Sequence, residues 1–377
     1  MIPVRYCAPV FDGSGYAKAA RGNIMALHKL GVPISVNPMS FESIKPNLNK
    51  EGKIIKSLVN KEIKYKVNIM HCTPEFYEKL KNPGIINLGM TIWETTKLHP
   101  DWAGYINNNT DGVIVGCPWN VEIFKASGVT VPIYVAEHGI EKNIHKNIKP
   151  MNITNLNDSA YKFYFIGQFT ERKNPIDLIK AYLHAFDKGE NVALIMKTYR
   201  SDYSETEKEA VRVTIKRLKF IMPMENYPPI YLILHMLSEN EIRSLHALGD
   251  CYISLDRGEG WGLSSFEAGA HGNPLIVTGF SGTTTYAKPD NSYLVDYTLT
   301  PVSGMTWCPW YRGDQLWASP DVEHAANRMR YVYENREEAF NKGKKLQSYI
   351  YDNFTWIDIG KKLVKIMEDA SSRRKKN

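Results

Sequence analysis

Residues 256–274 read DRGEGWGLSSFEAGAHGNP, and this stretch decides the fold that the sequence predicts. The apolar run just before it, residues 250–255, predicts a strand, and residues 264–271 predict a helix. The three glycines between them allow the backbone to approach a ligand closely. A helix that begins in such a turn points its first amides outward, where they can bind an anion. The stretch therefore predicts a strand, an anion-binding turn and a helix.

Outward from this stretch, apolar strands alternate with helices, which predicts an α/β fold of parallel sheets with helices on both faces. The predicted strands are residues 4–8, 34–37, 67–71, 85–93, 112–116, 133–137, 161–167, 192–197, 231–235, 250–255, 274–278 and 292–295. The predicted helices are residues 16–30, 119–127, 175–187, 239–248, 264–271, 322–333, 336–353 and 357–369. The strand and helix order starts again in the second half, which predicts two Rossmann-like domains.

A change in composition marks the boundary between these domains. At 377 residues the chain is too long for one ordinary core. Residues 146–160 are rich in Asn and Lys and lack apolar periodicity, as linkers do. We therefore expect an N-terminal domain over residues 1–145 and a C-terminal domain over residues 161–356.

Two glutamates in the opening stretch, Glu259 and Glu267, are eight positions apart, one in the turn and one in the second helical turn. They could face the two ends of a bound sugar nucleotide, or they could simply be favourable charges near a helix N-terminus. The stretch resembles the Glu-x7-Glu signature of glycosyltransferase family 4, which are retaining enzymes. The family's Gly-Phe-Gly, Glu-Ala and Gly-x-Pro elements correspond here to Gly-Trp-Gly, Phe-Glu-Ala and His-Gly-Asn-Pro.

This resemblance implies the GT-B fold, in which two Rossmann-like domains face each other and the C-terminal helix, here 357–377, crosses back to the N-terminal domain. It also implies that Glu259 hydrogen-bonds hydroxyls of the transferred sugar and that Glu267 binds the two ribose hydroxyls. The amides that would cradle the diphosphate belong to Gly260, Trp261, Gly262 and Leu263.

A second segment, FIGQFTERKNP at residues 165–175, resembles the family segment whose arginine and lysine clamp the donor diphosphate. Lys173 falls on the lysine, whereas Gln168 stands where the family has arginine, and Arg172 could supply the missing charge. Fixed cations stabilise the charge that gathers on a leaving diphosphate. Lys173, Arg172 and Glu259 are therefore our catalytic candidates. Gln168 and Lys197, the latter at a strand's carboxyl end, are candidates for donor binding.

The N-terminal half offers weaker candidates. Gly13 and Gly15 follow the first strand and resemble the family's glycine loop, which approaches the donor phosphates from the other side of the cleft. At the position where many family members have a histidine, this chain has a Trp-Glu pair, so we expect Glu94 to bind the acceptor. His71 and His138 also follow strands and could line the cleft, or they could be structural residues.

Composition restricts the class of protein. With 43% hydrophobic and 23% charged residues, the sequence is typical of a globular domain protein. It has neither the charged and apolar regions of a signal peptide nor an apolar run of the roughly 20 residues that span a bilayer. The scattered cysteines form no CxxC pair, so we expect reduced thiols, no metal site and a cytoplasmic protein. A peripheral position at the inner membrane face is compatible with this.

The reaction expected from the resemblance is metal-independent transfer of a sugar from a nucleotide-diphosphate sugar, preferably a UDP-sugar, with no other cofactor. The departing diphosphate would help to remove the acceptor's proton on the same face of the sugar. We expect a hydroxyl of a surface glycan or glycolipid as the acceptor. Two alternatives stay open: hydroxymethylated bases of viral DNA, or a non-catalytic module that only binds sugar nucleotides.

Charge and aromatic content bear on the partner. Between Lys45 and Lys66 there are seven lysines and two glutamates. This is either an ordinary solvated surface or a surface for an anionic partner, such as a membrane glycolipid or DNA. A later segment contains Trp307, Trp310, Tyr311 and Trp317, which could stack on a base or sugar or form the edge of a packed core. The sequence leaves the oligomeric state open.

Overall fold

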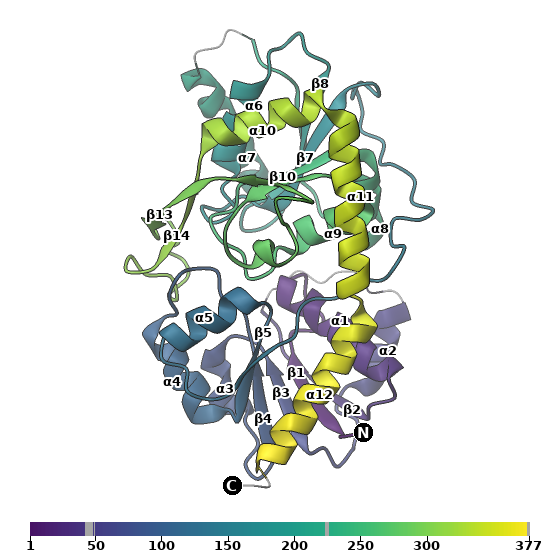
Figure 1. Cartoon of the computed structure of the whole chain (residues 1–377), viewed down its shortest axis with the longest axis vertical. Coiled ribbons are helices and arrows are strands. Elements are labelled where there is room, and N and C mark those ends of the chain that lie inside the picture. Colours follow the sequence, from purple (N-terminus) through teal and green to yellow (C-terminus); the bar gives the residue numbers. More distant parts are fainter. Residues whose placement is uncertain (42–47, 49, 223–225, 375–377) are drawn as a thin grey trace. The chain divides into compact units, whose positions relative to one another are not determined.

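The computed structural model describes residues 1–41, 48, 50–222 and 226–374 (Figure 1). The chain divides into two compact units. Unit 1 combines Met1–Lys142 with Asp352–Asn377, and unit 2 is Asn143–Tyr351. Residues 146–160, which the sequence suggested as a linker, belong to unit 2.

Unit 1 is built on a parallel six-stranded sheet with the strand order β2-β1-β3-β4-β5-β6. Its strands are β1 Val4–Ala8, β2 Ile34–Pro38, β3 Val67–His71, β4 Ile86–Met90, β5 Gly112–Val115 and β6 Ile133–Val135. The central strands β3, β4 and β5 are buried along their whole length, as expected where helices cover both faces of a parallel sheet. Its helices are α1 Gly15–Lys29, α2 Lys50–Leu58, η1 Pro74–Phe76, α3 Tyr77–Leu80, α4 Pro100–Asn109, α5 Pro118–Ala126 and α12 Trp356–Arg374.

The last helix, α12, belongs to unit 1 and lies along α1, as the sequence predicted (Figure 1). Its apolar side chains Leu363 and Met367 are buried in the core that surrounds β1. Two glycines make the close approach of the helices possible. An added Cβ at Gly360 would meet Ala26 at 3.0 Å, and one at Gly22 would lie 2.1 Å from the Trp356 ring.

We therefore expect Gly22→Ala to destabilise the protein by about 1 to 3 kcal/mol, because the new methyl group overlaps the half-buried indole of Trp356. Chemical denaturation measures this change. The control is Gly104→Ala in α4, where an added Cβ has no neighbour within 4 Å. There, alanine should be neutral or slightly stabilising because it favours the helix. Equal stability of the two variants would contradict the packing of α12 on α1.

Unit 2 has a second parallel six-stranded sheet, with the order β12-β11-β10-β7-β8-β9. Its strands are β7 Tyr161–Gln168, β8 Val192–Tyr199, β9 Ile230–Ile233, β10 Cys251–Ser254, β11 Leu275–Thr278 and β12 Tyr293–Val295. The first strand of the unit, β7, lies in the middle, with β8 on one side and β10 on the other. The strand order therefore reverses between β7 and β10, and ligands of open α/β sheets bind at the carboxyl ends of the strands at such a point.

Helices and one antiparallel hairpin complete unit 2. The helices are α6 Pro175–Ala185, α7 Glu205–Ile221, α8 Glu239–Leu248, α9 Leu263–His271, η2 Ser281–Thr285, α10 Val322–Glu334 and α11 Arg336–Asn353, the last of which ends in unit 1. The hairpin pairs β13 (Tyr297–Pro301) with β14 (Leu316–Pro320). Within the described residues, no helix is both long and apolar enough to cross a membrane.

The structure corrects several element predictions. The strand predicted at 85–93 ends at Met90, because Trp93 leaves the sheet: its backbone N–H and C=O bond to the side chain of Asn120. Among the described residues, the hairpin, four α-helices (α2, α3, α4 and α7) and the two short 3₁₀ helices (η1 and η2) were not predicted.

Candidate functional site

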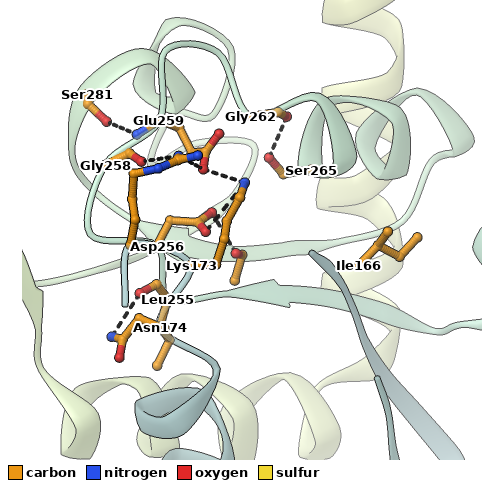
Figure 2. A network of polar contacts seen from close by, with 12 residues as sticks. Ile166, Lys173, Asn174, Leu255, Asp256, Gly258, Glu259, Gly262, Ser265 and Ser281 are labelled. Atoms are coloured by element: carbon orange, nitrogen blue, oxygen red, sulfur yellow. Dashed lines mark hydrogen bonds and ion pairs between the residues drawn. The ribbon is translucent and has the colours of Figure 1, made fainter. Parts of the chain in front are cut away.

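The catalytic candidates meet at the reversal point of the unit 2 sheet (Figure 2). Arg172 and Lys173 lie in the loop between β7 and α6, and Glu259 lies in the turn after β10. Arg172 Nη1 is 2.6 Å from Glu259 Oε1, and Lys173 Nζ bonds to the same oxygen. Parallel strands that are neighbours in the sheet thus place both cations and the carboxylate together.

The surroundings of Glu259 fix its charge and its backbone. Burial alone would raise the pKa of this carboxyl, but the charges of Lys173 and Arg172 outweigh burial and hold the pKa below its usual range. The backbone N–H of Glu259 donates to Ser281 Oγ at 2.9 Å, and its carbonyl accepts from Gly282 N at 2.8 Å. Glu259 is therefore an ionised, nearly buried group on a rigid turn.

Asp256 is a member of this cluster that the sequence analysis missed. Its carboxylate accepts a hydrogen bond from Ser254 Oγ at 2.6 Å, and its Oδ1 lies 3.9 Å from Lys173 Nζ. Figure 2 shows the Lys173 amine directed at the carboxylates of Asp256 and Glu259. Burial raises the pKa of Asp256 to about 6. The available signal was the position of Asp256, two residues beyond a strand end at the edge where ligands bind.

The raised pKa of Asp256 predicts a pH-dependent stability. Between its unfolded pKa near 3.8 and its folded pKa near 6, the folded state holds the proton more tightly, so stability falls as pH rises through this window. Asp256→Asn removes the penalty of ionisation. The free energy of unfolding of the variant minus that of wild type should be about 1 to 3 kcal/mol larger at pH 8 than at pH 4. Denaturation at the two pH values measures this, and a pH-independent difference would contradict it.

The helix next to this cluster, α9, begins in a turn that only glycine fits well. Gly262 precedes the helix with φ of +83°, where other residues are strained. An added Cβ would meet Ser265 Oγ at 2.8 Å, Thr283 Oγ1 at 2.9 Å and the Tyr286 hydroxyl at 2.9 Å. Ser265 and Tyr286 in turn bond to the Gly262 carbonyl, each at 2.9 Å. The start of α9 is thereby held in place, with its first amides at the turn.

The remaining residues of this motif have different environments. Trp261 is only 1% exposed and packs on the rings of Phe266 and Tyr286, so it can offer a ligand its backbone but not its indole. Glu267 is buried in the second turn of α9. Gly260, in the turn, is buried, and Leu263 is the first residue of α9.

The two further donor-binding candidates in unit 2 lie at the ends of β7 and β8. Gln168 donates a hydrogen bond to the Arg200 carbonyl at 2.7 Å. Lys197 is buried with its Nζ 3.1 Å from the Tyr203 hydroxyl and 4.7 Å from the centre of that ring. Burial lowers the pKa of Lys197 to about 8. Both side chains therefore contact their own unit, and their role in donor binding stays a prediction.

In unit 1, the predicted glycine loop between β1 and α1 is held by Asp12. Its carboxylate accepts hydrogen bonds from Ser14 N at 3.0 Å and from Phe41 N at 2.8 Å. Ser14 caps α1 by accepting from the backbone N–H of Ala17. Gly13 and Gly15, on either side of Ser14, are exposed. This is an ordered turn with an accessible backbone at the carboxyl edge of the sheet.

The acceptor candidates gather near the same edge of unit 1. His71 Nδ1 is 2.8 Å from the Tyr6 hydroxyl, and burial lowers the pKa of His71 to about 3, with a further contribution from His138. Burial also lowers the pKa of His138 to about 4. Glu94 is half-buried. Burial raises the pKa of Tyr16, and the charge of Glu94 adds to this; the Tyr16 ring centre is 5.6 Å from that of His71. Both histidines are therefore neutral near pH 7.

The basic segment can be followed in part. Lys45 lies outside the described residues. The six other lysines are all exposed, on α2 and on the chain that leads to β3: Lys50, Lys53, Lys56, Lys61, Lys64 and Lys66.

The cysteines and possible metal ligands are dispersed. All five cysteines are free thiols, and four of them are buried. Within the described part of the chain, no three His, Cys, Asp or Glu side chains group as a metal site requires. Metal independence stays a prediction.

No family model matches the chain. A curated relative, "Uncharacterized protein 356" of Sulfolobus islandicus rod-shaped virus 1, is 21% identical over 301 residues, which cover 79% of this chain and 80% of that protein.

Solved structures match nearly the whole chain. Sucrose-phosphate synthase from Thermosynechococcus elongatus has a TM-score of 0.70 at 12% identity and covers 99% of this chain and 100% of its own. A glycosyltransferase from Rickettsia africae has a TM-score of 0.65 at 15% identity, covering 98% of both chains. HepE of Anabaena, solved with UDP and glucose, has a TM-score of 0.64 at 12% identity and covers 98% and 100%. At these identities the likeness shows the fold, which is GT-B.

Proposed function

We propose that the protein is a retaining glycosyltransferase of family 4 that transfers a sugar from a nucleotide-diphosphate sugar to a hydroxyl acceptor. One observation carries the proposal. Lys173, Arg172 and Glu259 converge at the reversal point of the unit 2 sheet, beside the glycine-initiated helix α9. Two fixed cations and a helix N-terminus suit a diphosphate, and a carboxylate suits sugar hydroxyls.

In the proposed reaction, the bond between the anomeric carbon and the diphosphate oxygen breaks, and a bond from that carbon to the acceptor oxygen forms on the same face. The acceptor's proton passes to the departing diphosphate. Lys173 and Arg172 stabilise the charge on the diphosphate, and Glu259 orients the sugar. Glu259 holds both cations in the structure. A bound diphosphate therefore competes with this carboxylate oxygen for the two cations.

The nucleotide and the acceptor are further parts of the proposal. UDP is favoured because the GT-B neighbour HepE was solved with UDP and with UDP-glucose. Glu267 would bind the ribose from α9, and Gly13 and Gly15 stay candidates for binding the donor phosphates. For the acceptor we favour a glycan or glycolipid hydroxyl, with Glu94 as its partner in unit 1.

A second acceptor class is DNA with hydroxymethylated bases. The six exposed lysines in the segment 50–66 favour it, because clustered cations bind phosphate backbones. An anionic glycolipid surface would use the same lysines. These lysines therefore do not distinguish the two acceptor classes, and an experiment has to do so.

A donor screen tests the proposal. The protein is incubated without added metal with UDP-, GDP- and ADP-sugars, and free nucleoside diphosphate is measured beside a Glu267→Ala control. Parallel reactions contain hydroxymethylated DNA or a lipid-linked glycan. Release from one donor, lost in the control and stimulated by one acceptor, is the expected result. Tight binding without release would favour a non-catalytic module, and no binding of any donor would refute the proposal.

A further inference from the structure

The hairpin of β13 and β14, residues 297–320, has a packed core of its own. Trp317 on β14 is 2% exposed and packs with Val302 and Met305 from the loop between the strands, and Tyr311 lies against them. The loop is also tied across its base, where Val302 N donates to the Gln315 carbonyl at 2.9 Å. The aromatic segment is therefore partly a core, and the hairpin is a defined arm.

This arm is attached to the donor cluster of unit 2. Ala318 N on β14 donates to the Arg257 carbonyl at 2.8 Å, and Arg257 N donates to the Arg172 carbonyl at 2.8 Å. The loop of the arm touches the residue just before Arg172 as well. Gly304 lies so close to Glu171 that an added Cβ would be 2.4 Å from its Cγ. The arm is thus hydrogen-bonded, through the backbone of Arg257, to the backbone of Arg172.

Trp307 does not belong to this core. Trp307 is 64% exposed, although indole is among the side chains that gain most from burial. Leu299 and Tyr297 on β13 are also exposed. Exposed apolar groups collected on one element indicate an interaction surface. Since the arm has a stable core without Trp307, this indole is available to a partner.

The charge of the arm restricts the partner. Among its residues 297–320 there is one cation, Arg312, and one anion, Asp314. They pair with each other, with Arg312 Nε 3.0 Å from Asp314 Oδ1. A surface that binds DNA, RNA or anionic lipid needs several cations. The partner of the arm is therefore neutral.

Its polar groups are hydroxyls. Thr298, Ser303 and Thr306 are exposed near the aromatic residues, and Thr306 directly precedes Trp307. A sugar ring combines an apolar C–H face, which stacks on indole, with hydroxyls that bond to groups of this kind. A bilayer would instead favour a surface without these hydroxyls.

We propose that this arm binds a neutral oligosaccharide by stacking a sugar ring on Trp307, and so holds a glycan acceptor beside the donor site. The inference rests on the proposed transferase function and narrows its acceptor class.

A glycan array of neutral oligosaccharides tests this with the full chain in the presence of UDP. The glycan bound most strongly is then titrated calorimetrically into wild type, Trp307→Ala and Trp307→Phe. The control variant is Phe220→Ala, which removes another exposed ring, 88% exposed at the end of α7. We expect Trp307→Ala to weaken glycan binding about tenfold, the loss of one stacked ring. Trp307→Phe should retain most of the affinity, and Phe220→Ala all of it.

Titration of UDP into each variant separates the two proposals. Unchanged UDP affinity with lost glycan binding supports the arm as a glycan site. Equal glycan binding by wild type and Trp307→Ala, or no neutral glycan bound by wild type, overturns the inference while leaving donor binding intact. Binding through Trp307 to an oligo-dT strand or to neutral phosphatidylcholine vesicles also overturns it. If the wild-type protein does not bind UDP, the transferase function itself is refuted.

Discussion

Replacing Lys173 by alanine should lower kcat/KM for the sugar nucleotide by about 10²- to 10³-fold, as expected when one fixed group that stabilises transition-state charge is lost. The ammonium group lies between two carboxylates, bonded to Glu259 and 3.9 Å from Asp256. In the proposed reaction it is one of the two cations that stabilise the leaving diphosphate. Initial rates of nucleoside diphosphate release measure the effect.

The matched control is Lys180→Ala in α6, seven residues further on. Lys180 pairs with Asp177 of its own helix at 3.0 Å, and its side chain is about one-third exposed. Its replacement should leave kcat/KM within about twofold, in line with the small energies of such pairs. If Lys173→Ala retains wild-type activity as well, Lys173 does not stabilise the diphosphate.

Replacing Glu259 by glutamine should affect turnover and nucleotide binding in opposite directions. Turnover should fall by about 10²- to 10³-fold, because the charge that orients the sugar and holds the cations is gone. UDP should bind more tightly, by up to about tenfold, because the diphosphate no longer competes with a carboxylate for Arg172 and Lys173. Steady-state kinetics and calorimetry on the same preparation measure both quantities.

Glu207→Gln is the control for this second variant. Glu207 lies on α7, where its Oε2 is 3.7 Å from Arg200 Nε. It should change neither turnover nor UDP affinity. A Glu259→Gln variant that loses turnover and UDP affinity together would show that Glu259 supports the folded site rather than competing with the donor.

The strand, turn and helix of residues 251–271 were predictable because their signals are local. An apolar run, three glycines and a helical pattern follow one another without a break, and β10 and α9 lie where they were expected. Glu259 and Lys173 each follow a parallel strand, but neither segment alone predicts that β7 and β10 are neighbours.

Contacts between distant segments could not be predicted in this way. Ser281 supports the backbone of Glu259 from 22 positions away, with a positive φ of 61° that no local pattern announces. The pairing of β13 with β14 joins strands on either side of a loop whose aromatic residues gave no sign of which ring was buried. Trp317 is buried, whereas Trp307 is exposed.

Helix α7 is a different case, since its signals were present in the sequence. Ser204 caps the helix and accepts from the backbone of Glu207, and the buried positions Val211, Ile215 and Leu218 have helical spacing. The polar character of the rest of α7 concealed this pattern. The helix was missed because it contains no long apolar run, although its cap and its helical spacing were both present in the sequence.

A crystal structure of the protein with UDP would show whether the two cations and α9 hold the donor. The diphosphate should lie at the carboxyl edge of the unit 2 sheet, in contact with Lys173, Arg172 and the first amides of α9, with the ribose at Glu267. Glu259 should no longer hold both cations. UDP bound elsewhere would contradict this placement, for example in the cavity of about 540 Å³ at the amino-terminal edge of the same sheet, between Lys162 and Arg336.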